Sequence, residues 1–336
     1  MIRNSIGITL VCLFAFAALP IAAMAEDAEI VFVDLDRTFS DFYKTKRADA
    51  QLKEQADEFN DERTQLVDDF EALGFGAVWI PEAVGRDPLV HAGMLLAASR
   101  SLVVATGIAS IYARDAQAMA AGQLTLDEAH PGRFVLGLGV SHQPMVEDIR
   151  GPHYGPPLTA MRTYLDGMAG AMYFAAQPSV AGRTVLAALG PKMLALAADK
   201  TQGAHPYFVP PEHTAIARDA LGADAWLAPE QAVVLETDPA EARRLAREHM
   251  GTYLGLANYV NNLKRLGFTD DDVADGGSDR LVDAIVAWGD LDQVAARVRA
   301  HHDAGADHVA VQVVAAADHG PLNDLWRRLA PALVSG

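Results

Sequence analysis

The sequence has few of the residues that form covalent cross-links or thiolate metal sites. Its one cysteine among 336 residues is Cys12, which excludes an intramolecular disulfide and a metal site built from several cysteines. Eleven histidines are present, but none falls in a His-x-x-x-His or His-Glu-x-x-His spacing. We therefore expect no metal site.

Positive charge is also scarce. The chain has 27 lysines and arginines against 44 aspartates and glutamates, which gives a formal net charge of -17. This balance disfavours a surface that binds nucleic-acid phosphates, although a local basic pocket for one small phosphate remains compatible with it. Hydrophobic residues make up 51% of the chain, enough for a large core. We therefore expect no nucleic-acid partner.

The first residues have the pattern of a secretory signal peptide. Arg3 precedes an apolar run over residues 6–22, and Ala23-Met24-Ala25 offers a small-x-small cleavage site. The run is short for a membrane span and no positively charged stop follows it. We predict a signal peptide over residues 1–25 and no stable membrane span after its cleavage.

The next segment, residues 26–72, is rich in charge. Ile30–Val33 reads as a short buried strand, and a narrow apolar stripe with a seven-residue period predicts a long charged helix over 40–71. The stripe consists of Leu52, Phe59, Leu66 and Leu73. With Val31–Phe39 and Tyr43–Ala48, residues 1–70 resemble the N-terminus of the periplasmic Skp/OmpH chaperones.

From Leu73 onward, apolar strands alternate with helical stretches. We expect strands over 77–80, 102–106, 134–140, 183–189, 203–208, 230–235 and 308–314, with a helical insertion over 251–288. This alternation predicts an α/β fold with a parallel sheet and helices outside. Seven strands cannot close an eight-stranded (β/α)8 TIM barrel, so Ile30–Val33 would supply the first strand. The barrel domain would then be residues 73–336.

One of these strands, residues 134–140, has no polar face and leads into Ser141 and His142. In a parallel α/β protein, the residues that follow a strand are where chemistry collects. Gly137 and Gly139 lack Cβ atoms, so a flat ring or a neighbouring backbone could lie close against the strand. The alternative is a core strand with two packing glycines.

Several stretches in one order are similar to the luciferase-like monooxygenase superfamily, in particular to its coenzyme F420-dependent branch. They are Leu73–Glu82, Ala105–Ile108, Arg114–Asp115, Gly132–His142, Ala187–Met193 and Gly203–Tyr207, and the similarity covers roughly residues 70–315. The resemblance implies a TIM-barrel oxidoreductase that transfers a hydride between the deazaflavin F420 and a small organic substrate. FMN is the alternative cofactor, and relatives are commonly homodimers.

The resemblance also implies where the cofactor would bind. A non-proline cis peptide or bulge at Gly107-Ile108-Ala109-Ser110 would lie beneath the ring, with Gly137, Gly139 and Ser141 nearby. Gly190-Pro191-Lys192-Met193 opens a helix, and the amide groups there suit a phosphate. The candidate catalytic residues for proton transfer are His142, Glu82 and His205.

The chaperone-like segment stands where the family has its own first strand, which leaves three functions open. The chain is a deazaflavin-dependent oxidoreductase, an exported chaperone-like binding protein, or a gene fusion with a break near Phe70 and an inactive barrel. The location is open for the same reason. The signal peptide indicates a periplasmic or secreted protein, whereas the barrel family indicates the cytoplasm.

Overall fold

The computed structural model describes residues 53–54, 64–316 and 322–334. The predicted signal peptide, the strand Ile30–Val33, the chaperone-like stretches and most of the charged helix lie outside these residues. The chain divides into two compact units, Met1–Phe59 and Asn60–Gly336. In the first unit residues 53–54 are helical, and in the second the described part of the charged helix covers residues 64–72.

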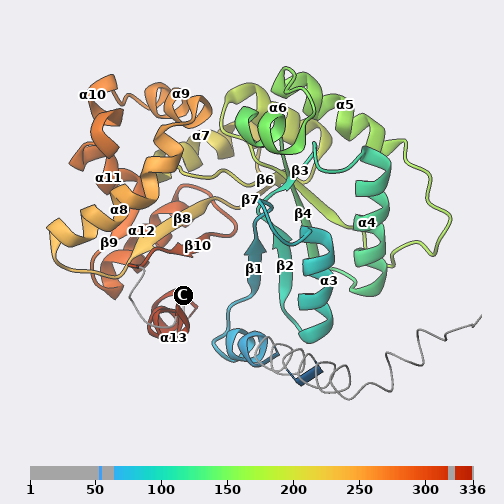
Figure 1. The fold of residues 1–336 in the computed structure, drawn as a ribbon. Coiled ribbons are helices and arrows are strands. Elements are labelled where there is room, and N and C mark those ends of the chain that lie inside the picture. Colours follow the sequence, from blue (N-terminus) through green and yellow to red (C-terminus); the bar gives the residue numbers. More distant parts are fainter. Residues whose placement is uncertain (1–52, 55–63, 317–321, 335–336) are drawn as a thin grey trace, which may run out of the picture. The chain divides into compact units, whose positions relative to one another are not determined.

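The larger sheet of the second unit is parallel and curled (Figure 1). Its strand order is β1-β2-β4-β5-β6-β7, with β3 paired to β4. In β1 and β2, Ala77 pairs with Val103 and Ile80 with Thr106, so the two strands end together. The strands are β1 (Ala77–Ile80), β2 (Val103–Thr106), β3 (Ala109–Ser110), β4 (Phe134–Gly139), β5 (Arg183–Leu186), β6 (Gly203–Ala204) and β7 (Trp226–Leu227).

A smaller parallel sheet follows, in the order β10-β8-β9. Its strands are β8 (Glu230–Val234), β9 (Val286–Trp288) and β10 (Ala310–Val313). The two sheets adjoin, because Glu230 N donates to Pro206 O beyond β6 and Asp307 N donates to Leu227 O of β7. The prediction of a wholly helical insertion over 251–288 is wrong at its end. There an apolar run forms β9 on the edge of β8 that β10 leaves free.

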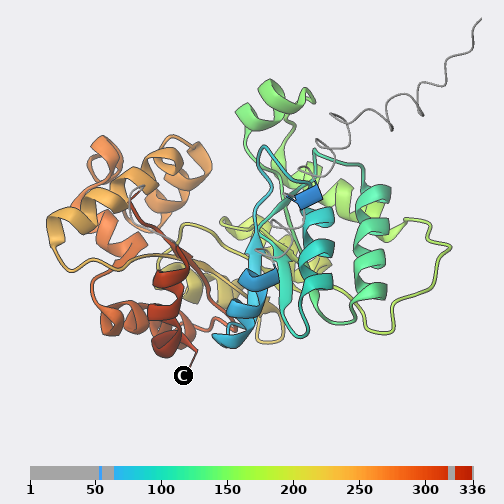
Figure 2. The same ribbon diagram turned by 60° about the horizontal axis from the view of Figure 1, so that its bottom comes forward.

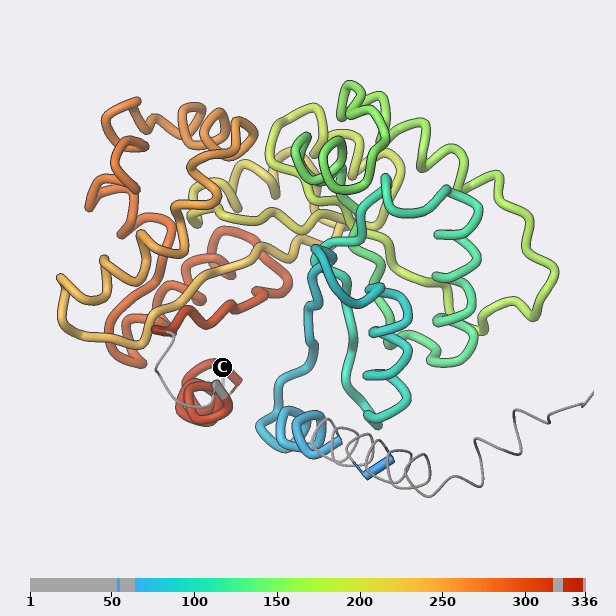
Figure 3. The backbone as a smooth tube through the Cα atoms, in the orientation of Figure 1, coloured from blue at the N-terminus to red at the C-terminus, as the bar shows by residue number. Residues whose placement is uncertain are grey.

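Helices cover the sheets in alternation with the strands, as the sequence predicts. Several begin at an aspartate whose side chain accepts hydrogen bonds from backbone N–H groups of the first turn, as Asp87 does for α3 and Asp115 for α4. The insertion holds α9, α10 and α11, which Figure 3 shows as one group beside β8 and β9. The helices are α3 (Pro88–Ala98), α4 (Ala116–Ala129), η1 (Met145–Arg150), α5 (Pro157–Ala169), α6 (Pro191–Lys200), α7 (Pro211–Leu221), α8 (Pro239–Leu254), α9 (Ala257–Arg265), α10 (Asp270–Val273), η2 (Ala274–Gly276), α11 (Asp279–Ile285), α12 (Leu291–Asp303) and α13 (Leu322–Leu333).

The last helix, α13, was not predicted. Its buried Leu329 packs with Val233 and Ala287 in the core of the smaller sheet. Its Trp326 packs against Phe70 and Phe75, with ring centroids 5.5 and 5.3 Å away. Figure 2 shows α13 beside the helical residues that precede β1. The described helices include none that is both long and apolar enough to cross a membrane.

An aromatic layer fills the inside of the curled sheet between β1 and the segment before β10. Trp79 stacks on His205 with ring centroids 4.1 Å apart, and its Nε1 donates to His308 Nε2 at 3.1 Å. Trp226 completes the layer at 5.9 Å from Trp79. The contact between Trp79 and His308 brings the two ends of the strand series together. Closure of the barrel by Ile30–Val33 stays a prediction, since that segment lies outside the described residues.

Candidate functional site

The candidate residues lie at the ends of neighbouring parallel strands. Glu82 follows β1, and Gly107 follows β2. His142 follows β4, and His205 follows β6. Because parallel strands place their carboxyl ends at one edge of the sheet, the fold gathers these residues at the same rim. The sequence predicts the functional residues at this rim.

The Gly107–Ile108 peptide is cis, at the position that the family resemblance indicates. The segment is tied to β4, since Gly137 N donates to Thr106 Oγ1 at 2.9 Å and Thr106 Oγ1 donates to Gly137 O at 2.8 Å. A Cβ on Gly137 would lie 2.0 Å from Thr106 O, and one on Gly139 would lie 2.4 Å from Ile108 Cδ1. The backbone of Thr106 thus fills the space against Gly137, and the side chain of Ile108 fills the space against Gly139.

Replacing Gly137 with alanine is expected to lower the free energy of unfolding by about 3 kcal/mol, the upper end of the cost of overpacking. The neighbouring atom is a backbone carbonyl, so relief requires the 106–108 segment to move. Thermal and denaturant unfolding measure the effect. The matched control is Gly155→Ala, because nothing lies within 4 Å of a Cβ there. Equal unfolding temperatures for the two variants would contradict this packing.

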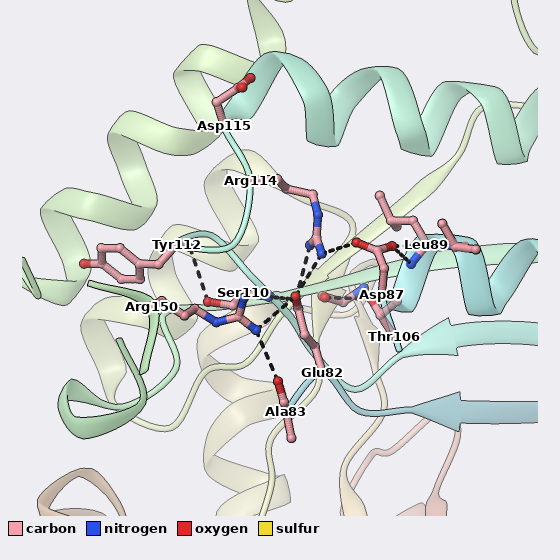
Figure 4. A network of polar contacts seen from close by, with 12 residues as sticks. Glu82, Ala83, Asp87, Leu89, Thr106, Ser110, Tyr112, Arg114, Asp115 and Arg150 are labelled. Atoms are coloured by element: carbon pink, nitrogen blue, oxygen red, sulfur yellow. Dashed lines mark hydrogen bonds and ion pairs between the residues drawn. The ribbon is translucent and has the colours of Figure 1, made fainter. Parts of the chain in front are cut away.

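Glu82 is the centre of a charged network (Figure 4). Its side chain is 5% exposed, and Arg114 binds both carboxylate oxygens, at 2.8 and 3.2 Å. Ser110 N donates to Oε2 at 2.7 Å and Arg150 Nη2 donates to Oε1 at 3.2 Å. Arg114 also donates to Asp87 at 2.8 Å. Burial lowers the pKa of Arg114, but the bonds and charges of its two carboxylate partners outweigh this and leave the pKa above its usual value.

Both oxygens of Glu82 are therefore engaged, by two guanidinium groups and one backbone amide. The network joins the end of β1 to β3, to the start of α3 and to η1. Such contacts position the segment around the cis peptide. Sequence reasoning identified Glu82 but assigned no role to Arg114 or Arg150. The sequence signal for these arginines was Glu82 itself. An acidic residue directly after a buried strand is itself buried and therefore needs a cationic partner.

His142 is half-buried where β4 leads into η1. Its ring lies 5.6 Å from that of Tyr259 in α9, and it shares a hydrogen bond with Asn258. Burial lowers the pKa of His142, and the Asn258 bond opposes the shift only in part. The preceding residue, Ser141, has φ 56°, a left-handed conformation uncommon for residues other than glycine. The insertion thus packs directly on the candidate catalytic histidine, which is neutral at pH 7.

His205 lies deeper, in the aromatic layer. Its side chain stacks on Trp79, it is 4% exposed, and its Nδ1 is 2.6 Å from Ala228 O. A carbonyl only accepts, so Nδ1 carries the proton of the neutral ring. Burial lowers the pKa of His205 to about 4. A Cβ on Gly107 would lie 3.3 Å from His205 Nε2, so the ring of this histidine packs against the segment that contains the cis peptide.

The stretch Gly190-Pro191-Lys192-Met193 begins α6, as predicted. No side chain caps this helix end, and Lys192 is exposed. A residue that the sequence did not single out lies beside it, since a Cβ on Gly190 would be 3.4 Å from Arg265 Nη2. The same Nη2 donates to Asn262 Oδ1 at 3.1 Å. Asn262 is 2% exposed, and its Nδ2 has no partner among the residues described.

Comparison with known proteins identifies a family that matches most of the chain. The luciferase-like monooxygenase family matches residues 41–308. A Mycobacterium tuberculosis protein, called "Putative coenzyme F420-dependent oxidoreductase Rv3520c", is 26% identical over an alignment that covers 78% of this chain and 92% of that protein. The family match begins at residue 41, within the charged segment 26–72 that precedes the barrel in the sequence-based prediction.

Solved structures share the fold. An F420-dependent secondary alcohol dehydrogenase in complex with an F420-acetone adduct superposes with a TM-score of 0.63 at 13% identity, covering 80% of this chain and 94% of that one. A type II Baeyer-Villiger monooxygenase of Pseudomonas putida in complex with FMN gives 0.55 at 16% identity, covering 81% and 91%. The chain belongs to the luciferase-like monooxygenase family, and its general class is that of an oxidoreductase.

Proposed function

We propose that the protein transfers a hydride between the deazaflavin coenzyme F420 and a small organic substrate. The observation that carries the proposal is the group of anion-binding donors at the start of α6, on the rim that also holds His142. The family match and the name of the mycobacterial relative support the same cofactor. FMN is the alternative, because a structure of the same fold is described with it.

The residues at the start of α6 fit the phosphate of such a cofactor. An uncapped helix N-terminus presents backbone N–H groups and a partial positive charge. Arg265 adds a full charge next to Gly190, and Asn262 Nδ2 is a buried donor that needs an acceptor. Because the whole chain has a net charge of -17, a bound anion needs positive charge close by, and Arg265 supplies it here.

When bound, the deazaflavin supplies a carbon atom that gives or takes a hydride. The chain supplies orientation and proton transfer. His142, neutral near pH 7 and directed by Asn258, can accept the proton of a substrate hydroxyl. Glu82 holds the segment that would support the ring, through Ser110 N and Arg114. Ile108, seated on β4, provides an apolar surface for a flat ring.

A titration of the full-length protein against the fluorescence of coenzyme F420 tests the proposal. We expect a saturable change, and Arg265→Ala should weaken binding by roughly 10- to 100-fold, the effect of losing one or two hydrogen bonds to a charged group. Arg299→Ala, on the exposed side of α12, is the control. A parallel titration with FMN decides between the cofactors. If neither cofactor shows saturation, the proposal is wrong.

A further inference from the structure

The backbone turns sharply just before the candidate catalytic histidine. Three described residues other than glycine have a left-handed conformation, and one of them, Ser141, directly precedes His142. Its φ is 56°, a region in which the Cβ of an L-residue crowds the following carbonyl oxygen. Such a conformation persists only where other contacts hold it, and it is common at functional sites. The turn at Ser141 leads the chain out of the buried strand β4 and sets the direction in which His142 points.

The side chain that holds this turn is that of Tyr154, thirteen residues further along the chain. Its hydroxyl donates to Ser141 O at 3.3 Å. The half-buried Tyr154 ring packs on the ring of Tyr112, with centroids 5.6 Å apart, and its backbone N donates to Glu147 Oε1 of η1 at 2.9 Å. A ring contact and a backbone hydrogen bond therefore fix the place of the hydroxyl that meets Ser141 O.

The same segment also anchors the backbone at and after the histidine. Val146 N donates to His142 O at 3.0 Å, and Val146 is fully buried. Gln143 Nε2 donates to Glu147 Oε2 at 2.8 Å. Residues 141, 142 and 143 are thus each bonded to the segment 146–154. With its backbone held in this way, His142 directs its ring to α9, where it shares a hydrogen bond with Asn258.

We propose that Tyr154 is a positioning residue for His142: by holding Ser141 in its left-handed conformation, the tyrosine hydroxyl keeps the imidazole directed at Asn258. The inference rests on the proposed function for the role of this imidazole as proton acceptor, but the geometry exists without a cofactor. Without the tyrosine hydroxyl, Ser141 can relax to the negative φ that serine ordinarily adopts, and this redirects the next residue. The imidazole then divides its time between Asn258 and solvent.

Nuclear magnetic resonance of the histidine ring nitrogens in the full-length protein, without cofactor, tests the proposal. The His142 signal is identified by its absence from His142→Gln. We expect Tyr154→Phe to move this signal and to raise the pKa of His142 towards 6.5, because burial lowers the pKa and a more exposed ring is easier to charge. The matched control is Tyr173→Phe, which removes an exposed hydroxyl that bonds Glu128 and should leave the signal unchanged.

A second substitution separates positioning from a general loss of packing. Glycine adopts a left-handed backbone without crowding, so Ser141→Gly needs less help to keep the turn. Adding Tyr154→Phe to Ser141→Gly should therefore move the His142 signal less than Tyr154→Phe does alone. A tyrosine that acts only through its own packing would have the same effect with and without Ser141→Gly, because independent substitutions add.

The kinetic readout is separate from the magnetic resonance readout. In the coenzyme-dependent reaction, Tyr154→Phe should lower kcat by roughly 5- to 10-fold, the effect of one lost hydrogen bond, with little change in coenzyme affinity. An unchanged His142 signal in Tyr154→Phe overturns the positioning role, as does an equal shift with and without Ser141→Gly. If Tyr154→Phe moves the signal as expected but the wild-type protein binds no cofactor, the positioning role stands and the proposed function is wrong.

Discussion

Replacing His142 with glutamine is expected to lower kcat for the proposed F420-dependent hydride transfer by about 10²- to 10⁴-fold, the usual contribution of a positioned general base. Glutamine retains hydrogen bonding to Asn258 but cannot take up a proton at the substrate. Coenzyme affinity should change little, because the proposed anion-binding residues belong to α6 and α9. The rate is measured from the absorbance of the oxidised coenzyme over a panel of alcohols.

The pH profile of the wild-type enzyme gives an independent check of the same role. Burial lowers the pKa of His142 below 6.5, so the imidazole stays neutral through pH 7 and becomes charged only in more acidic solution. A charged imidazole cannot accept a proton, so kcat/KM should fall as the pH drops through this lowered pKa. The acid limb should be absent in His142→Gln and present in His153→Gln, where an exposed histidine is replaced. A wild-type profile in His142→Gln, at a wild-type rate, would assign the proton to another group.

Replacing Glu82 with alanine is expected to lower the free energy of unfolding by about 3–5 kcal/mol, as for other buried ion pairs that lose one partner. The cost arises because Arg114 and Arg150 lose their shared carboxylate and Ser110 N loses its acceptor. Arg114, whose side chain is 12% exposed, would retain only Asp87. Urea unfolding followed by circular dichroism measures the change.

A surface ion pair provides the matched control for this prediction. Asp324 bonds Arg327 at 3.0 Å, but both side chains are more than half exposed. Asp324→Ala should therefore cost no more than about 1 kcal/mol, because solvent screens exposed charges. Glu82→Gln should fall between the two, since the amide oxygen can still accept from Ser110 N. A Glu82→Ala protein as stable as Asp324→Ala would mean that the network contributes little to the fold.

The sequence by itself determined most of the order of strands and helices, with β3, β7, β9 and α13 as exceptions, and the residues at the ends of the predicted strands. Period-two and apolar runs specify strands locally, and aspartates such as Asp87 and Asp115 start helices by accepting from amide groups two or three residues away. It also placed Glu82, His142 and the start of α6 at one rim, because parallel strands end on one side. All of these inferences depend on neighbours within a few residues.

Only the tertiary structure shows which side chains form hydrogen bonds and ion pairs with one another. Arg114 and Arg150 come 32 and 68 residues after Glu82, and Gln312 comes 105 residues after Tyr207. No local pattern encodes which side chains meet across such distances. The role of Gly137 and Gly139 was also decided by packing. A bound ring and a closely packed neighbouring segment both require residues without a Cβ, and only the structure shows that Thr106 and Ile108 fill the space. Arg265 and β9 escaped prediction because each acquires its role from a contact with a distant element.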